Sequence, residues 1–373
     1  MKPPVEAYVS AQGTRIYRIP LRLFPGMHGY AHLIIDGQEL SLFDVGSGFG
    51  NCNEDLEAGL EDIRVAYDET VSWERISKIF ISHGHIDHYG GLNFVRARTD
   101  APIIIHELER RVLTNYDSRL SLVAGRLERF LIGAGIQEEE RQEVMEMYLL
   151  HKQLFSSIQV QATYEELGMR SGKLLFEHVP GHCPGHVIAW VDDILLSGDH
   201  ILRETSPHQA PESLSLNMGL EHYLNSLAKV APRAHRASWT LGGHEGPIED
   251  LPARIHAIVD LHRERLLKIL RLFDEPKTIG EVSHQLFPKT EGYHRLLALE
   301  ETGAHVEYLH TRGYISIEDS GTPEQGSIKV NRYVHLAGGE PEFPGLKIFS
   351  ESIPLNGTEA FNVSGMPRAE RAG

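Results

Sequence analysis

The sequence predicts an α/β protein, because short apolar strand-like runs alternate along the chain with amphipathic helical segments. In residues 15–45, apolar residues recur at period two or in buried clusters, as in RIYRIPLRLF and AHLIIDG. Other segments carry apolar residues three and four apart, with charges between them. Polar, histidine-containing sequences follow several strand-like runs. We therefore expect a sheet-based fold with its functional groups at strand ends.

The first half of the chain is predicted to contain a sheet, its covering helices and a helical insertion. Strands are expected at 15–24, 31–37, 40–45, 78–82 and 101–106, and helices at 53–68 and 92–98. A glycine-rich loop at 46–50 follows the third strand. From about 107 to 157 the pattern becomes amphipathic and helical, which predicts an insertion.

The second half of the chain is predicted to contain strands, followed by helices and a β-hairpin. Strands are expected at 173–179, 187–191, 194–198 and 238–244, with a hairpin turn at Asp192-Asp193 and a helix over 219–231. Helices are then expected at 253–273, 278–287 and 292–313, before a β-hairpin. Thr278 and Glu281 form a capping-box signature for the second of these helices.

Three helices and a hairpin are the outline of a winged helix, which suggests how the chain divides. We expect a catalytic domain over residues 1–252, including the insertion at about 107–157. A winged-helix-like domain is expected over 253–335. Residues 336–373 are rich in Gly, Pro, Glu and Ser, and they are expected to form a flexible tail.

The composition excludes several classes of function. Among 373 residues, 36 Lys and Arg against 52 Asp and Glu give a net charge of −16. This charge disfavours a general affinity for nucleic acid or anionic membranes. Two cysteines provide no disulfide framework. No signal-peptide pattern is recognisable, and no uncharged apolar run approaches the roughly 18 residues of a membrane span. A cytoplasmic protein is expected.

Four polar sequences share one property: each follows an apolar strand. They are HGHIDH at 83–88, PGHCPGH at 180–186, SGDH at 197–200 and LGGH at 241–244. Side chains at neighbouring strand exits can converge, and a metal site needs several imidazoles or carboxylates around one ion. A lone histidine in a loop is usually structural, so we interpret His106, His200 and His235 in that way. HGHIDH is too dense in histidine and aspartate for that explanation, and Gly84 suggests a tight loop.

Here the chain resembles the metallo-β-lactamase superfamily, whose signature is His-x-His-x-Asp-His on the loop after a strand. The resemblance covers roughly residues 14–250 and includes FDVGSG at 43–48. It implies a four-layer αββα sandwich with two metal ions at one edge. It also implies the ligands, which would be His83, His85 and His182 for one ion, Asp87, His88 and His244 for the other, and Asp199 between them.

These residue types suit two divalent ions, most plausibly zinc, with iron or manganese as alternatives. A water between the ions would lose its proton near pH 7 and act as the nucleophile. Asp44 is expected to orient a ligand through hydrogen bonds. His186 lies four residues from His182, and spacing alone leaves open which of them ligates; the resemblance favours His182.

Two further residues complete the candidate site, and Asp87 is given a second role. Asp87 and Tyr89 are the candidate catalytic residues, and Tyr89 could donate a proton to a leaving group, although a tyrosine there is more often packing. Cys183 stands where relatives usually carry Thr or Ser. It is interpreted as a packed residue, with a thiol near the metals as the alternative.

The predicted function is a dinuclear hydrolase of a small acyl substrate, such as a thioester, ester or lactone. The resemblance includes a cytoplasmic branch with a similar C-terminal module, one member of which is an endoribonuclease, so phosphodiester cleavage is the alternative. The helix over 292–313 carries Glu300, Glu301 and Glu307 against Arg295 and Arg312, which makes nucleic acid an improbable partner. The C-terminal module is then expected to serve in packing or in the formation of a homodimer. A mononuclear-iron sulfur dioxygenase and a non-catalytic DNA-binding regulator are further alternatives.

Overall fold

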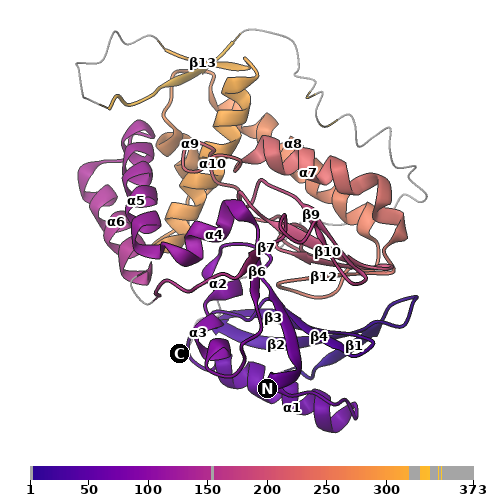
Figure 1. The fold of residues 1–373 in the computed structure, drawn as a ribbon. Helices are drawn as coiled ribbons and strands as arrows, with labels where there is room; N and C mark the ends of the chain where they lie inside the picture. The colour runs from indigo at the N-terminus through magenta and orange to yellow at the C-terminus, as the bar shows by residue number, and fades with distance from the viewer. Residues whose placement is uncertain (1–2, 153–154, 319–327, 337–342, 344–345, 347–373) are drawn as a thin grey trace, which may run out of the picture.

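Two β-sheets packed face to face form the centre of the molecule (Figure 1). The computed structural model describes residues 3–152, 155–318, 328–336, 343 and 346. The first sheet has the order β1-β2-β3-β4-β5-β6-β7 and the second β12-β11-β10-β9-β8. A small two-stranded sheet, β13-β14, lies near the C-terminal end of the described chain.

The first sheet follows chain order from edge to edge. Its strands are β1 (Glu6–Val9), β2 (Arg15–Phe24), β3 (Met27–Asp36), β4 (Glu39–Phe43), β5 (Ile76–Phe80), β6 (Ile103–Ile105) and β7 (Ala162–Thr163). The strands β1 to β4 pair antiparallel, whereas β4 to β7 pair in parallel. Helices between the parallel strands make these crossovers possible. The carboxyl ends of β4 and β5 therefore lie at the same edge, where the loops 44–50 and 81–91 begin.

The second sheet is antiparallel except for one pair. Its strands are β8 (Arg170–Ser171), β9 (Leu174–His178), β10 (Val187–Val191), β11 (Ile194–Gly198) and β12 (Trp239–Gly242). The turn between β10 and β11 is the predicted hairpin, and Asp192 has a φ of 55° in it. Aspartate tolerates this left-handed conformation better than most residues. Because β11 and β12 are parallel, Asp199 and His244 follow two strands that end at the same edge.

Side-chain alternation along the strands creates the layers. Ile34 of β3 and Phe80 of β5 face Ala189 and Leu196 of the second sheet. The neighbouring Leu33 and Ile35 face the opposite side, where they pack with α1 (Cys52–Ala66) and α3 (Leu92–Arg96). On the far side of the second sheet, Ile188 and Trp190 pack with α7 (Leu220–Val230) and α8 (Leu251–Leu272). The expected four-layer αββα sandwich is confirmed.

The predicted helical insertion is present between β6 and β7. It consists of α4 (Glu107–Thr114), α5 (Tyr116–Gly133) and α6 (Glu138–Lys152). In Figure 1 these helices lie on one side of the sandwich, next to the C-terminal helices. Arg295 of the last helix pairs with Glu140 of α6 at 2.9 Å. The insertion therefore contacts the C-terminal helices.

The C-terminal elements also match the expectation. Helices α8, α9 (Ile279–Leu286) and α10 (Tyr293–Thr311) precede β13 (Ile315–Ile317) and β14 (Tyr333–His335). The capping box of Thr278 and Glu281 opens α9 as predicted. Buried side chains of α8 to α10 form one continuous core with the second sheet. The division at residue 252, the winged-helix assignment and the dimer stay predictions, and most of the expected tail at 336–373 lies outside the described residues.

Among the described helices, none combines the length and the apolar character that crossing a membrane requires. A cytoplasmic location stays a prediction.

Candidate metal centre

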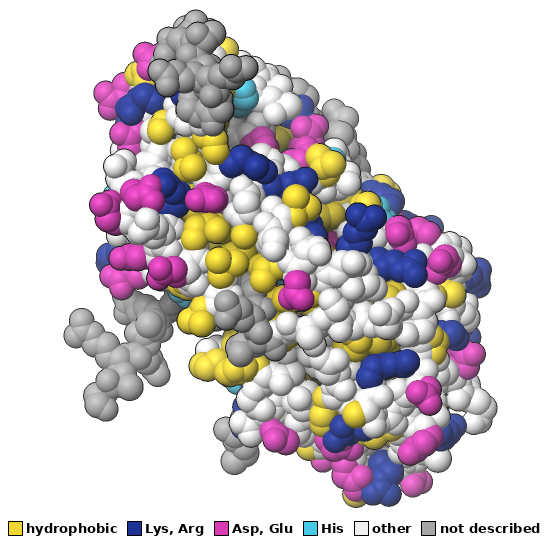
Figure 2. All heavy atoms as spheres, turned by 60° about the vertical axis from the view of Figure 1, so that its left-hand side comes forward, with side chains coloured by type: hydrophobic (Ala, Val, Ile, Leu, Met, Phe, Trp, Pro, Cys, Tyr) yellow, Lys and Arg dark blue, Asp and Glu magenta, His cyan; other side chains and the backbone are white. Residues whose placement is uncertain are grey.

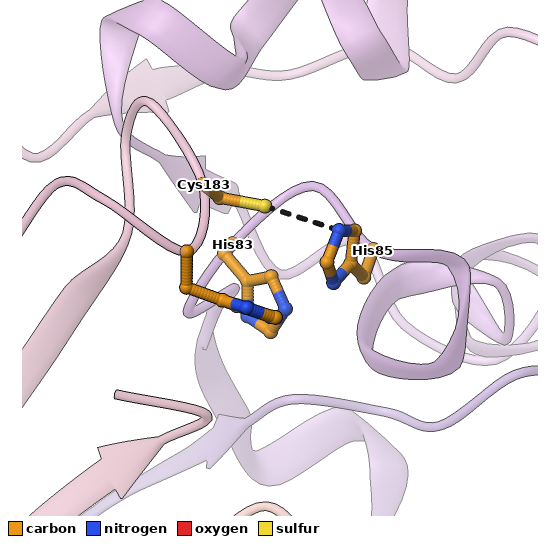
Figure 3. A group of neighbouring side chains, drawn as sticks. His83, His85 and Cys183 are labelled. Carbon is orange, nitrogen blue, oxygen red and sulfur yellow. Dashed lines mark hydrogen bonds between the residues drawn. The ribbon is translucent and has the colours of Figure 1, made fainter. Parts of the chain in front are cut away.

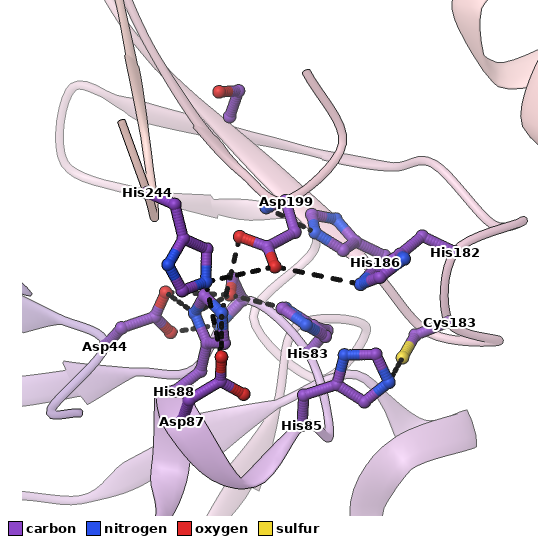
Figure 4. Close-up of polar contacts among 12 residues, drawn as sticks. Asp44, His83, His85, Asp87, His88, His182, Cys183, His186, Asp199 and His244 are labelled. Carbon is purple, nitrogen blue, oxygen red and sulfur yellow. Dashed lines mark hydrogen bonds and ion pairs between the residues drawn. The ribbon is translucent and has the colours of Figure 1, made fainter. Parts of the chain in front are cut away.

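The four predicted polar sequences converge at one edge of the sandwich (Figure 4). HGHIDH follows β5 and runs into the short helix α2 (Ile86–Tyr89). The PGHCPGH loop follows β9, Asp199 follows β11, and His244 follows β12. The loops thus bring ten predicted site residues, from Asp44 to His244, into one cluster.

The first group of candidate ligands contains His83, His85 and His182, with Cys183 beside them. One nitrogen of each histidine and the cysteine sulfur all lie within 4.8 Å of one another. The ring centroids of His83 and His182 are 5.1 Å apart, and those of His85 and His182 are 4.6 Å apart. Nitrogen ligands about 2 Å from one ion lie a little over 3 Å from each other. Small side-chain shifts would therefore bring this group around an ion.

The second group contains Asp87, His88, Asp199 and His244, again within 4.8 Å of one another. Oδ2 of Asp87 lies 3.2 Å from Nε2 of His244 and 3.9 Å from Nε2 of His88. Asp87 and His88 are consecutive in α2, so this short helix supplies two members by itself. The geometry matches a second ion site with one carboxylate from α2.

Asp199 lies between the two groups. Its Oδ2 is 3.8 Å from Nε2 of His182 in the first group and 3.4 Å from Nε2 of His244 in the second. Its Oδ1 is 3.4 Å from Nε2 of His88. One carboxylate in contact with both groups is the arrangement that a bridging ligand requires.

In each candidate histidine, the ring nitrogen that faces away from the expected metal ion contacts another protein group. Nδ1 of His83 contacts the Ser82 hydroxyl at 2.9 Å, and Nδ1 of His88 contacts Oδ2 of Asp44 at 2.9 Å. The carbonyls of His208 and His28 accept from Nδ1 of His182 (2.8 Å) and of His244 (2.7 Å). In His85 the engaged nitrogen is Nε2, which lies 3.3 Å from the sulfur of Cys183 (Figure 3). Such contacts fix the tautomer and orientation of metal-binding imidazoles.

Asp44 supports two of these loops at once. It has a φ of 61° directly after β4. Oδ1 accepts from the Ser82 backbone N–H at 2.7 Å, while Oδ2 accepts from the Ser82 hydroxyl at 2.8 Å and from His88. This buried carboxylate therefore ties the glycine-rich loop to HGHIDH, and its role as an orienting residue of a metal ligand stays a prediction.

The charges of the centre are strongly coupled. Burial alone would raise the pKa of Asp199, but His244 and His88 hold it well below its usual range. Burial would lower the pKa of His88 and of His244. Asp199 and Asp87, together with Asp44 in the case of His88, instead raise both pKa values well above the ordinary histidine value. Burial lowers the pKa of His83 and of His182. The carboxylates thus favour the protonated form of His88 and of His244.

Several buried polar atoms at the centre lack a hydrogen-bond partner among the described residues. They include Nε2 of His83, His88 and His182 and Oδ1 of Asp199. Each such orphaned atom costs free energy unless a ligand satisfies it. Divalent cations would satisfy them and displace protons from His88 and His244. The residues present therefore fit two metal ions.

Two glycines allow other side chains to pack closely against the loops of the centre. A Cβ on Gly243 would lie 2.6 Å from Cε1 of His88 and 2.7 Å from Oδ1 of Asp199. A Cβ on Gly84 would collide with Oε2 of Glu109, a buried residue of α4 that accepts from the Gly185 N–H at 2.9 Å. The space beside Gly84 is thus filled by a carboxylate that connects the HGHIDH and PGHCPGH loops.

Other predicted residues lie around the centre. Nε2 of His186 accepts from the backbone N–H of Asp199 at 3.1 Å, so His186 supports the loop while His182 faces the ligand groups. Tyr89 is 4% exposed and packs in the core between the first sheet and its helices. His106 caps α4 and pairs with Glu165 at 2.9 Å, whereas His235 is exposed. His200 is fully buried beside Tyr223.

Sequence reasoning missed several residues that shape the site. Arg18 of β2 is fully buried, stacks on Tyr30 and donates to the carbonyl of Glu245, so it anchors the loop that carries His244. The carbonyls of His28 and His208 were also missed. A backbone carbonyl has no side-chain signature, and only Ser82, next to the motif, could have been suspected from sequence.

The arrangement matches a known family. The family model described as the metallo-beta-lactamase superfamily matches residues 25–276. The chain belongs to this superfamily. Metallo-beta-lactamase superfamily members are generally metal-dependent hydrolases, and this chain is an enzyme of that class with side-chain clusters that could bind metal.

Structural comparisons agree with this membership. A metallo-beta-lactamase family protein from Thermus thermophilus is 25% identical, with a TM-score of 0.66 over 86% of this chain and 98% of that one. A beta-lactamase domain protein from Burkholderia ambifaria is 20% identical, with a TM-score of 0.63 over 89% and 94% of the two chains. An uncharacterized protein of Mycobacterium leprae is 27% identical over 132 residues, which span 35% of this chain and about half (52%) of that relative.

Proposed function

We propose that this chain is a dinuclear metal-dependent hydrolase of small acyl compounds, such as thioesters, esters or lactones. The observation that carries the proposal is Asp199, whose carboxylate contacts both groups of candidate ligands. His83, His85 and His182 would hold one ion, and Asp87, His88 and His244 the other. Two bound ions, most plausibly zinc, would supply a hydroxide nucleophile near neutral pH and polarise the bond to be cleaved.

The protein's own residues orient this chemistry. Asp44, Ser82 and the carbonyls of His28 and His208 keep the imidazoles in the tautomers that leave one nitrogen for metal. Burial excludes bulk water from most of the candidate ligands, so their charges act at low dielectric. Metal binding requires His88 and His244 to give up their protons, so occupancy should rise with pH.

Two features of the molecule support an acyl substrate over nucleic acid. The last helix, α10, is largely buried, and its glutamates face a loop of the same chain instead of an open groove. Exposed leucines occur on the insertion at Leu122 and Leu150, and Figure 2 shows hydrophobic side chains gathered on this side of the molecule. Exposed apolar side chains suit contact with an acyl group, whereas single-stranded nucleic acid requires a basic groove.

Metal analysis combined with a substrate panel tests the proposal. The purified protein should bind two divalent ions per chain and hydrolyse at least one thioester, ester or lactone. Asp199→Ala should abolish that turnover. The matched control is Asp36→Ala, a partly exposed aspartate of β3.

Two other outcomes would replace the proposal. Cleavage of labelled RNA that depends on Asp199, without acyl turnover, would indicate a phosphodiesterase. One iron per chain with oxygen consumption on a persulfide would indicate a sulfur dioxygenase.

A further inference from the structure

Three glutamates of α10 hold the segment of residues 206–213, which lies between Asp199 and α7. Oε2 of Glu301 accepts from the Gln209 N–H at 2.8 Å, and Oε2 of Glu307 accepts from the Glu212 N–H at 2.6 Å. The His208 side chain lies 3.0 Å from Oε2 of Glu300. The acidic face of α10 is thus directed at this segment. Helix α10 lies outside the residues that match the family model, which end at residue 276.

A single peptide group of this segment connects α10 to the metal centre. The carbonyl of His208 accepts from Nδ1 of His182 at 2.8 Å, and the N–H of the same peptide unit, on Gln209, donates to Glu301. A negative charge on the N–H side polarises a peptide and strengthens its carbonyl as an acceptor. A stronger acceptor on Nδ1 makes the opposite nitrogen of the imidazole a better metal ligand.

Glu301 is well placed to act in this way. Glu301 is 8% exposed, and its Oε1 atom pairs with Arg265 of α8. Burial raises the pKa of Glu301, but Arg265 and the nearby histidines more than offset this and lower it to about 2. The carboxylate is therefore charged and fixed between two helices.

Glu301, His262 and His305 could in principle form a third metal site, because their ligand atoms lie within 4.8 Å. The hydrogen bonds favour a different role. His305 Nδ1 donates to the Glu301 carbonyl at 2.7 Å, His262 Nδ1 donates to His305 Nε2 at 3.1 Å, and the Ser206 hydroxyl donates to His262 Nε2 at 2.8 Å. This assignment engages all four ring nitrogens, so the cluster joins α8 and α10 to the start of the segment.

We propose that Glu301 is a positioning residue of the metal centre, acting through the 208–209 peptide to orient and polarise His182. The inference rests on the proposed role of His182 as a metal ligand. It extends the centre to α10, more than 100 residues beyond His182 in the sequence.

Stepwise metal binding to the Glu301→Gln variant tests this inference. Glutamine keeps the shape and one oxygen but removes the charge. Competition between the apoprotein and a chelator for Zn²⁺ should show that the dissociation constant of one of the two ions rises about 10-fold, while the other changes little. In ¹⁵N-histidine spectra, the Nδ1–H proton of His182 should move upfield, because its acceptor is weaker.

The matched control is Glu221→Gln, which removes an exposed ion pair between α7 and Arg312, the residue that follows α10. It should leave both metal affinities and the His182 proton unchanged. If Glu301→Gln lowers only the unfolding temperature of the apoprotein, or weakens both ions equally, the residue is merely structural and the inference is wrong. Binding of a third ion that Glu301→Gln abolishes would also overturn it.

The His182→Ala variant separates this inference from the proposed function. If His182→Ala weakens one ion and Glu301→Gln weakens none, only the positioning role fails. If His182→Ala weakens neither ion, the ligand assignment fails and the inference fails with it.

Discussion

Asp44 and His88 form a buried carboxylate–imidazole pair in which Oδ2 lies 2.9 Å from Nδ1. The pair connects the loop after β4 to α2, the helix that also carries Asp87. With its proton held on Nδ1, His88 presents Nε2 to Asp87 and Asp199. The correct tautomer of His88 therefore depends on a charge outside the ligand groups.

We expect Asp44→Asn to weaken binding of the ion at the second group by about 10- to 100-fold. An amide N–H₂ facing Nδ1 would place the histidine proton on Nε2, the nitrogen that metal requires. Chelator competition with the apoprotein measures this loss. Asp36→Asn, at a partly exposed site 3.3 Å from Lys173, is the control and should bind both ions like the wild type. Unchanged affinities in Asp44→Asn would contradict the role given to Asp44.

The four polar sequences could be located from sequence because each of them follows an apolar strand, whereas their division into two ligand groups came from the resemblance to the superfamily. His83 to His88 are contiguous, and His182, Asp199 and His244 follow β9, β11 and β12. Strand periodicity placed these ends, and the density of histidine and aspartate indicated a metal site. The same periodicity predicted the individual strands, the insertion and the C-terminal helices, while the packing of two sheets was implied by the resemblance.

The backbone carbonyls that support the ligands could not be predicted, because they depend on tertiary packing. The carbonyl that orients His244 belongs to His28, 216 positions earlier, and the one that orients His182 belongs to a loop fixed by α10. The glutamates of α10 suggested a surface that disfavours phosphates, whereas Glu301 is buried and faces a loop. The amphipathic spacing of α10 does not show that these glutamates find their partners inside the fold.

Tyr89 is expected to act mainly in packing. Its ring is 4% exposed in the core, and burial strongly raises its pKa. A general acid contributes about 100-fold or more to the rate, so Tyr89→Phe distinguishes the two roles. We expect kcat to stay within a small factor of the wild-type value on whichever substrate is turned over. A loss of about 100-fold, with metal content unchanged, would instead identify Tyr89 as a proton donor.

The stability of the protein should fall in mild acid because of buried neutral histidines. Burial lowers the pKa of His305 to about 4, against an unfolded value of about 6.5. Between these values the unfolded chain binds more protons, so the free energy of unfolding decreases as pH falls from about 6.5 to about 4. His305→Gln should reduce this slope by up to about 1.4 kcal/mol per pH unit in denaturant titrations of the apoprotein.

The control for that pH dependence is Leu309→Ala, which truncates a fully buried side chain one turn along α10. It should cost about 2–5 kcal/mol at every pH and leave the slope unchanged. Equal slopes in His305→Gln and the wild type would show that His305 does not supply this proton uptake.

The two cysteines allow a test of whether sulfur binds metal. Cys183 contacts Nε2 of His85 at 3.3 Å, and every other candidate histidine has a protein group on its far nitrogen, so we expect the thiol to orient His85 and not to ligate. The Co²⁺-substituted protein should then lack the near-ultraviolet band of sulfur-to-cobalt charge transfer. Cys183→Ala should weaken one ion by about 10-fold, because a partner of a ligand histidine is lost. Cys52→Ala, at the buried start of α1, should bind both ions normally. A charge-transfer band that Cys183→Ala removes and Cys52→Ala keeps would make Cys183 a ligand of the first ion.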